Sequence, residues 1–569
     1  MASAAEVVRN NAVREAIAAL TAPGQPYEMR TETIGGRSQR VWVHSPADLR
    51  QVLDSSVKYG DRTFLVLGQE RWSFERHRRA AVALAHHLVD DLAIGPGDRV
   101  AIAMRNRPEW SVAFWAIVSI GAIAVPLNGW WLGHELAFAL SDSGARVLIA
   151  DEERAERVRA ELPDTVEHVI VTGARFDDVI AGRKGADRLP HVEIDPDQDA
   201  TLLYTSGTTG RAKGVVGSHR NMVSSLLSRR FFRDVHESMT LSDAATTGDV
   251  QPSLPPVTLL TVPLFHVTGS HSYLLTALAS GTTLVLMHRW DVHEALDLVA
   301  REQITSLGGV PFMALQIAEV YDPDRHDLRS LTALSVGGAA SPPGLAPQLT
   351  RLLPGVVLGN GYGMTETSAV AVFNHGPDLV ARPGSLGRIV PVMDAIVVDE
   401  DDEPVPSGTP GELWLRGPNV VRGYWNRPEE TAAAFVGDGW LRTGDIVIGD
   451  DDGFLSLVDR RKEIIVRGGE NIAPAEVQAA LLAHPDVLDV AVVPIPHPTL
   501  GEQVAALVVP RPGSCLDADA VGAFARRHLA PFKVPSVVVF ADEPLPRSPQ
   551  GKLVRSTIAS IVIDSVDQH

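Results

Sequence analysis

Between residues 46 and 390 the chain alternates short apolar runs with longer segments in which apolar residues recur at helical spacing. Residues 75–92 have the helical spacing, and the run RVAIAM at 99–104 is typical of a buried strand. The same order returns in 134–144 and 145–150. Helices that alternate with short apolar strands predict an α/β protein in which layers of helices cover a largely parallel sheet.

The pattern changes twice towards the end of the chain. Residues 390–459 contain short strand-like runs between Pro and Gly turns, which predicts a small β-barrel or β-rich subdomain. A compact α+β pattern then continues to the last residue. We therefore expect a large N-terminal domain at 1–459, which includes a polar extension at 1–45, and a small, mobile C-terminal α+β domain at 460–569. The hinge between the two domains is predicted at 459–462.

One uncharged run, Trp110–Leu127, is long enough to imitate a membrane span. A helix that ends near Gly121, followed by a short buried strand, produces the same apolar run, and we favour that interpretation. The first 20 residues are charged throughout and predict an amphipathic helix rather than a signal peptide. The polar, Pro-containing connection at 233–258 predicts either a lid over a pocket or a disordered surface loop.

Composition and charge exclude several classes of binding partner and site. The 569 residues include 45% hydrophobic and 21% charged positions, which is typical of a globular protein and excludes a disordered or fibrous chain. The net charge of −19 argues against nucleic acid and anionic membranes as partners. Residues 460–569 are nearly neutral, at −1, whereas residues 1–459 carry −18. The single cysteine, Cys515, excludes an internal disulfide and a cysteine-cluster metal site, and it favours a reducing, cytoplasmic location.

A glycine-rich loop with the sequence YTSGTTGRAKG occupies residues 204–214, directly after an apolar strand. Its backbone N–H groups, hydroxyls and following lysine suit a phosphate group. It is not a Walker loop, because Ala212 stands where the second Gly of that pattern belongs. No GxGxxG follows a strand and no HExxH occurs, so a Rossmann oxidoreductase and a zinc peptidase are disfavoured.

With this loop the chain resembles the adenylate-forming superfamily, and the acyl-CoA synthetases are the most similar branch. The resemblance extends from about residue 46 to 560, because further motifs follow in the family's order. These motifs are PLFHVTG (263–269), SVGGAASPP (335–343), GYGMTET (361–367), PGSLGR (383–388), GELWLRGPNVVRGYWNRPEET (411–431), GWLRTGDI (439–446), DRRKEIIVRGGENIAPAEVQ (459–478) and PRSPQGKLVR (546–555).

The resemblance implies a two-step reaction. A carboxylate attacks the α-phosphate of ATP, which gives an acyl-adenylate and pyrophosphate, and a thiol, usually that of coenzyme A, then displaces AMP. Mg²⁺ accompanies the ATP. The family fold, a large N-terminal domain with a small C-terminal lid that rotates between the steps, agrees with the boundary expected from the sequence pattern.

The nucleotide-binding residues follow from matching motifs. The resemblance implies that the pyrophosphate part of ATP is held by Thr205, Ser206, Gly207, Thr208, Thr209 and Lys213. It implies an adenine slot formed by Gly338, Ala339, Ala340, Asn360 and Tyr362. Asp445 and Arg460 are expected to bind the ribose hydroxyls.

The catalytic residues are assigned in the same way. Lys552 matches the family's catalytic lysine, Glu366 its magnesium ligand, and Thr365 a contact to the α-phosphate. His266 matches a gate at the mouth of the acyl pocket, to which we assign a steric role rather than proton transfer. Lys462 occupies the hinge position. The remaining match is the loop beside coenzyme A, which contains Gly468 and Gly469.

The substrate is less well defined. The acyl pocket is expected from segments 266–273, 309–313, 337–340 and 360–370, which are mostly small or apolar and contain no Lys or Arg that would bind a second carboxylate. They favour a hydrophobic acid, which could be a fatty, aryl or polycyclic acid.

Several other functions share some of these motifs. A stand-alone acyl-AMP ligase that loads a separate acyl carrier protein shares all of them and remains the alternative. A peptide-synthetase module is disfavoured because only 17 residues follow Lys552. Nothing in the sequence points to a luciferase-type oxygenase. A catalytically inactive nucleotide-binding protein is disfavoured by the presence of Lys552, Glu366 and Lys213.

Overall fold

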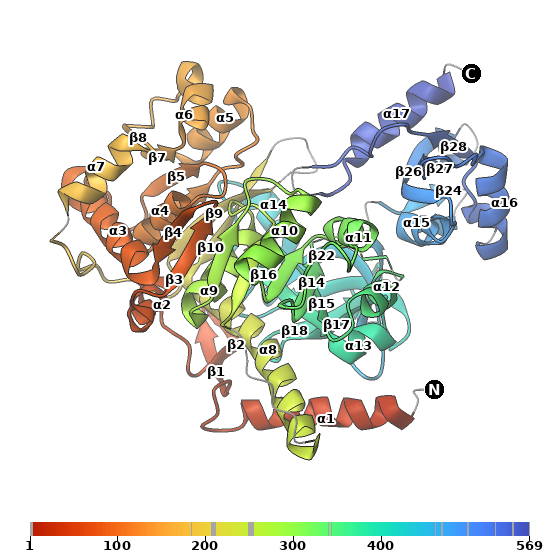
Figure 1. Ribbon diagram of the computed structural model, residues 1–569, viewed down its shortest axis with the longest axis horizontal. Coiled ribbons are helices and arrows are strands. Elements are labelled where there is room, and N and C mark those ends of the chain that lie inside the picture. Colours follow the sequence, from red (N-terminus) through yellow and green to blue (C-terminus); the bar gives the residue numbers. More distant parts are fainter. Residues whose placement is uncertain are drawn as a thin grey trace.

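The fold is given by a computed structural model, in which a large mixed α/β body carries a small α+β unit at one end (Figure 1). Strands up to Arg460 belong to the sheets of the large body, and strands from Ile465 onward form a separate sheet. The structure describes residues 4–183, 185–205, 212–247, 255–338, 341–342, 344–460, 463–467, 470–497, 500–529, 531–548 and 551–567.

The first sheet of the large body is mainly parallel and carries the hairpin of the glycine-rich loop at one side. Helices alternate with its strands, as the sequence pattern predicts. In spatial order its strands are β20 (Gly423–Tyr424), β10 (Lys213–Ser218), β9 (Asp199–Thr205), β6 (Ile123–Pro126), β5 (Arg99–Ala103), β7 (Val147–Ala150) and β8 (His168–Val171). The associated helices are α3 (Phe74–His86), α4 (Pro108–Val118), α5 (Gly133–Ser143), α6 (Glu152–Val158) and α7 (Ala174–Gly182).

The second sheet has a parallel half that continues into an antiparallel half. In spatial order its strands are β18 (Asp394–Val398), β19 (Pro410–Arg416), β22 (Trp440–Gly449), β23 (Leu455–Arg460), β17 (Ser385–Ile389), β16 (Ala369–His375), β15 (Val357–Met364), β14 (Ala333–Gly337), β13 (Ser306–Gly309), β11 (Val257–Leu260), β12 (Thr283–Leu286), β3 (Thr63–Leu67) and β4 (Glu70–Ser73). The short strand β21 (Phe435–Val436) pairs with β22. The strands expected in the β-rich segment 390–459 thus join the large sheet through β17.

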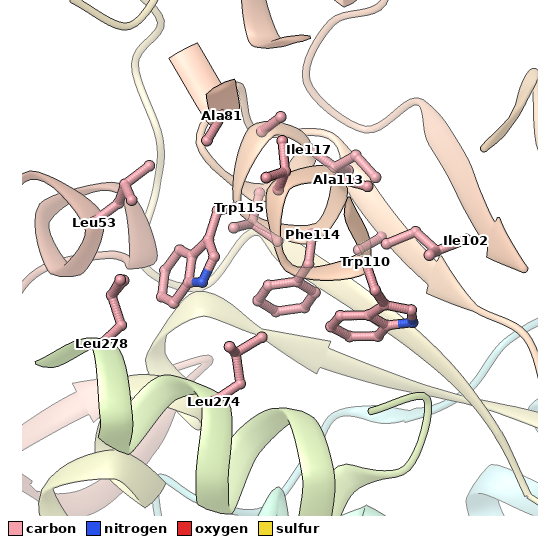
Figure 2. Packing of buried hydrophobic residues seen from close by; sticks show 14 of the residues in the cluster. Leu53, Ala81, Ile102, Trp110, Ala113, Phe114, Trp115, Ile117, Leu274 and Leu278 are labelled. Atoms are coloured by element: carbon pink, nitrogen blue, oxygen red, sulfur yellow. The ribbon is translucent and has the colours of Figure 1, made fainter. Parts of the chain in front are cut away.

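The uncharged run at 110–127 is divided between α4 and β6, which confirms the helix and strand predicted there. Figure 2 shows Phe114 and Trp115 of α4 pointing towards Leu274 and Leu278, with Trp110 beside Phe114, and all five side chains are fully buried. Trp110 and Phe114 stack with ring centroids 5.4 Å apart, an arrangement that adds to the hydrophobic gain from their burial. Among the described residues no helix has the length and apolarity needed to cross a bilayer.

Helix α8 (His219–Thr247) corrects one expectation. Residues 233–247 of the predicted irregular connection form the second half of this helix, because the stretch contains no Gly or Pro that would end it. Residues 248–254 lie outside the described residues. The N-terminal helix α1 (Ala4–Thr21) lies beside α8, as Figure 1 shows.

The N-terminal extension is fastened to α8 by side chains. After α1 it continues in the hairpin of β1 (Met29–Ile34) and β2 (Arg37–Trp42). Tyr27 donates a hydrogen bond of 2.5 Å to Asp234 Oδ2 on α8, and its ring meets the ring of Phe231 edge-on, with centroids 5.2 Å apart. Trp42 packs against the same Phe231, which is fully buried. The extension thus supports one flank of α8.

The remaining helices of the large body are short. They are α2 (Leu49–Ser55), α9 (Leu275–Ser280), α10 (Val292–Glu302), α11 (Pro311–Val320), α12 (Leu345–Leu352), α13 (Gly376–Ala381) and α14 (Pro428–Ala434). A π-helical segment, Thr268–Leu274, precedes α9. Segments of this kind are frequent at functional sites, and this one contains several residues of the expected acyl pocket.

The small unit has its own sheet and its own cores on both sides of that sheet. Its strands are β25 (Glu470–Ile472), β24 (Ile465–Arg467), β27 (Gly501–Pro510), β26 (Val487–His497) and β28 (Val537–Phe540), and its helices are α15 (Pro474–Leu482), α16 (Ala518–His528) and α17 (Arg555–Asp567). Between β28 and α17 a loop crosses back to the large body, and this loop carries Lys552.

Candidate active site

The candidate active site surrounds a cavity with about 470 Å³ of empty space, including its open mouth. Parallel strands β13, β14 and β15 end at this cavity, which is where α/β sheets usually bind ligands. All four expected segments contribute to its walls, and α8 adds a residue that the sequence interpretation missed. The lining residues are Arg229, Val267, Thr268, Ser272, Tyr273, Gly309, Ser335, Val336, Gly337, Gly338, Gly361, Tyr362, Gly363, Ala369, Val370 and Phe373.

Lys552 lies at the tip of a hairpin-like loop that reaches this cavity from the small unit. Ser548 N–H donates to the Lys552 carbonyl at 2.7 Å, and Gly551 N–H donates back to the Ser548 carbonyl at 2.8 Å. Gly338 has a φ of +75°, and a Cβ atom built on it would lie 4.0 Å from Lys552 Cε. The loop therefore brings the predicted catalytic lysine to the wall of the predicted acyl pocket.

The same loop is docked on α11. The Arg547 guanidinium carbon lies 4.4 Å from the centroid of the Phe312 ring, and Arg547 also donates to Asp489 Oδ2 at 2.6 Å. A Cβ on Gly551 would lie 2.8 Å from Val310 Cγ2, so glycine is needed for this close approach. These contacts hold the loop against the large body in the present arrangement.

His266 lies close enough to Lys552 for the two side chains to interact. Burial lowers the pKa of His266 to about 3, and the positive charge of Lys552 acts in the same direction. The Nε2 atom is enclosed and has no hydrogen-bond partner in the described part of the chain. The imidazole is therefore neutral at pH 7 and a weak base, and its steric role stays a prediction.

Tyr362 and Asp445 are 83 positions apart in sequence and share a hydrogen bond. The Tyr362 hydroxyl donates to Asp445 Oδ2 at 2.6 Å, and Asp445 is only 1% exposed. Asp445 lies opposite Arg460 in the antiparallel pairing of β22 with β23. The predicted adenine-stacking ring and the predicted ribose ligand Asp445 are thus brought together, and the backbone of Arg460 lies at the paired position.

A second cavity, of about 300 Å³, adjoins the other face of β15. Asn360, which is 6% exposed, lines it together with Ser341 and Pro342. The Ser341 hydroxyl is buried and has no partner among the described residues. This cavity therefore offers an amide and an unsatisfied hydroxyl beside the predicted adenine slot.

The expected phosphate and metal residues meet around Tyr424, which the sequence interpretation did not single out. Thr205 and Lys213 pair across the β9–β10 hairpin, and the Lys213 ammonium lies 5.2 Å from the centroid of the Tyr424 ring. The Tyr424 hydroxyl donates to Glu366 Oε1 at 2.9 Å. Burial, followed by the charge of Glu366, holds the pKa of Tyr424 above its usual range. Tyr424 belongs to the Gly-Tyr pair inside the motif at 411–431, and this pair was the sequence signal that could have identified it.

Glu366 suits a magnesium ion bound together with nucleotide phosphates. It lies in a single 3₁₀ turn, Thr365–Thr367, and the Tyr424 O–H donates to only one of its carboxylate oxygens. The described residues contain no group of three or more acidic, His or Cys side chains that would form a complete metal cage. Mg²⁺ is commonly held by one or two carboxylates and substrate phosphates, and this donor set fits that arrangement.

Several predicted site residues lie outside the described residues. They are Ser206, Gly207, Thr208, Thr209, Ala339, Ala340, Lys462, Gly468 and Gly469. Their roles remain predictions from the motifs.

Comparison with known proteins identifies the family to which this chain belongs. The AMP-binding enzyme family matches residues 53–425, and the AMP-binding enzyme C-terminal domain matches residues 476–552. A feruloyl-CoA synthase from Amycolatopsis sp is 36% identical over 467 residues, which are 82% of this chain and 89% of that protein. A long-chain-fatty-acid–CoA ligase from Escherichia coli O6:H1 is 32% identical across 93% of this chain and 99% of its own.

Solved structures agree with these relatives. The anthranilate CoA ligase AuaEII in complex with anthranoyl-AMP has a TM-score of 0.80 at 25% identity, covering 92% of this chain and 99% of that one. ATP-bound MatB from Rhodopseudomonas palustris has a TM-score of 0.80 at 27% identity, covering 91% and 99%. Fold and site together define an adenylate-forming acid–thiol ligase that uses ATP. The chain belongs to the AMP-binding enzyme family, which confirms the resemblance and reaction class predicted from the motifs.

Proposed function

We propose that this enzyme activates a hydrophobic carboxylic acid as its acyl-adenylate and transfers the acyl group to coenzyme A. The proposal is carried by the contact between the Lys552 loop and the Gly338 wall of the acyl cavity. An ammonium group at this position meets both anions of the first step, the substrate carboxylate and the α-phosphate of ATP. A preorganised donor of this kind typically contributes about 2.7–4 kcal/mol to transition-state stabilisation.

The other site residues each bind a different part of the nucleotide in this proposal. Asp445 accepts hydrogen bonds from the ribose, and Tyr362 orients that carboxylate while its ring stacks on the adenine. Thr205 and Lys213 hold the pyrophosphate end, together with the loop residues between them. Glu366 holds Mg²⁺, which when bound offsets negative charge on the phosphates. Neutral His266 closes the mouth of the cavity against water.

The small unit rotates between the two steps in this proposal. The boundary at 459–462 coincides with the change from one sheet to another between Arg460 and Ile465, and Lys462 acts as the hinge. Rotation withdraws Lys552 after adenylation and brings the loop of Gly468 and Gly469 towards coenzyme A. The near-neutral charge of residues 460–569 supports this movement, because that unit must close over anionic ligands.

The test is release of pyrophosphate across a panel of acids, measured with and without coenzyme A. We expect release that requires an acid and a thioester product that requires coenzyme A. Release of pyrophosphate without any thioester, but with acylation of a supplied carrier protein, would instead support the acyl-AMP ligase. No acid-dependent release with any acid would refute the proposed function.

A further inference from the structure

Arg229 gives the acyl cavity a charge that the motifs did not predict. It projects from α8 and is the one Lys, Arg, Asp or Glu side chain among the described lining residues. The other walls are Gly, Ala, Val, Phe and Tyr, with the hydroxyls of Thr268, Ser272 and Ser335. A half-buried guanidinium is therefore placed in a mainly apolar acyl pocket.

The guanidinium has a fixed support but no counterion in the described structure. Its carbon lies 4.9 Å from the centroid of the Tyr273 ring. Tyr273 is held in place by its close approach to Gly308, where a Cβ atom would lie 1.5 Å from the Tyr273 hydroxyl oxygen. An aromatic face covers one side of a guanidinium and leaves its in-plane N–H donors for an acceptor.

A nearby arginine on the same helix, by contrast, has carboxylate partners. Arg233, one turn further along α8, forms an ion pair with Asp234 at 2.8 Å and lies 3.6 Å from Glu237. No carboxylate in the described part of the chain lies within ion-pair distance of Arg229. A charge that is partly removed from water and left unpaired is costly, so an anion arriving beside it is favoured.

Hydrogen bonds and packing around α8 fix the rotation of the helix about its axis. The Ser225 hydroxyl donates to the Ser368 carbonyl at 2.6 Å, and Asn419 Nδ2 donates to the Ser228 hydroxyl at 3.3 Å. Three residues after Arg229, and so on the same side of the helix, Phe232 packs against the lining residue Phe373, with ring centroids 5.1 Å apart. The position of Arg229 in the cavity wall is therefore set by the fold.

We infer that the acid carries a second carboxylate, remote from the one that reacts, and that Arg229 binds it. The inference rests on the proposed function, because it concerns the acid activated in that same cavity. Lys552 approaches the Gly338 wall, which identifies the reacting end, whereas Arg229 belongs to the α8 wall. The planar fork of arginine matches a carboxylate with two parallel hydrogen bonds. The substrate class is thus an acid with an apolar body and a distal carboxylate.

Two matched pairs of acids test this inference: octanoate with octanedioate, and cinnamate with 4-carboxycinnamate. The readout is the ratio of kcat/KM between the members of a pair, measured by pyrophosphate release in the presence of coenzyme A. The wild type is expected to favour the dicarboxylate of at least one pair by about tenfold or more. Arg229→Met is expected to remove or reverse this ratio, and Arg229→Lys to restore part of it.

Arg233→Gln is the matched control, because it removes an arginine from the same helix without touching the cavity, and its ratio should equal that of the wild type. A wild type that prefers the monocarboxylate of both pairs, with a ratio unchanged by Arg229→Met, would overturn the inference while leaving the proposed function intact. A preference for 4-hydroxycinnamate over 4-carboxycinnamate would also overturn it. Absence of pyrophosphate release with every acid would instead refute the proposed function.

Discussion

The contact between the Lys552 loop and α11 can be perturbed by a single methyl group. Gly551 has a φ of +76°, and a Cβ atom on it would lie 2.8 Å from Val310 Cγ2. Gly551→Ala therefore introduces two costs. One is the left-handed backbone, about 1–2 kcal/mol for a residue other than Gly. The other is the clash with Val310, which exists only while the loop is docked on the large body.

Only the clash with Val310 should slow adenylation more than thioester formation. The backbone strain remains in both orientations of the small unit and cancels when the two steps are compared. Accommodating an extra methyl group in a packed contact typically costs about 1–3 kcal/mol. At 1.36 kcal/mol per factor of ten, Gly551→Ala should slow adenylation by about 5–150-fold relative to thioester formation.

Two assays separate the half-reactions. Acid-dependent exchange between ATP and labelled pyrophosphate reports adenylation, and conversion of a supplied acyl-adenylate and coenzyme A reports thioester formation. The matched control is Gly513→Ala, because Gly513 has a similar φ of +82° but nothing within 4 Å of the new methyl group. This control should leave the ratio of the two rates at the wild-type value.

A double mutant identifies the clash itself. Val310→Ala removes the atom that the new methyl group meets, so Val310→Ala with Gly551→Ala should regain most of the lost adenylation rate. Contacting residues typically show coupling energies of about 0.5–3 kcal/mol in such a cycle. Equal loss of both half-reactions in Gly551→Ala, or no coupling with Val310→Ala, would refute the reasoning.

Three further outcomes are expected. Lys552→Ala should slow acid-dependent pyrophosphate exchange by about 10²–10³-fold yet still convert supplied acyl-adenylate to thioester, and loss of both would contradict its assignment. Tyr424→Phe, which removes the donor to Glu366, should raise the Mg²⁺ concentration needed for half-maximal activity by about tenfold; an unchanged requirement would separate Tyr424 from metal binding. Burial lowers the pKa of His77 to about 3, so its contribution to stability is full above pH 6.5 and falls by about 1.4 kcal/mol per pH unit below that value; His77→Gln should reduce the pH slope in urea titrations by about this amount.

The sequence was sufficient for the layers and the motifs, because both depend on local patterns. The division of 110–127 into α4 and β6 followed from one glycine and the length of the apolar run. The individual residues Tyr362 and Asp445 followed from their motifs. Their shared hydrogen bond did not, because no local signal connects positions 83 residues apart.

Two functional features escaped prediction for physical reasons. Arg229 lies in α8 without a distinctive neighbouring motif, and its direction depends on Ser225, Phe232 and their partners Ser368 and Phe373. Residues 233–247 were expected to be irregular because their polarity was taken as a loop signal, but the stretch contains no Gly or Pro and continues α8.

The attachment of the N-terminal extension to α8 has a consequence for how substrate preference can change. Tyr27 and Trp42 contact the turn of α8 that follows Arg229, so substitutions in the extension alter the support of a pocket wall without altering any pocket residue. Selection for a new acid, in nature or in directed evolution, can therefore act through the first 45 residues. A mutational search restricted to the cavity lining would overlook this route.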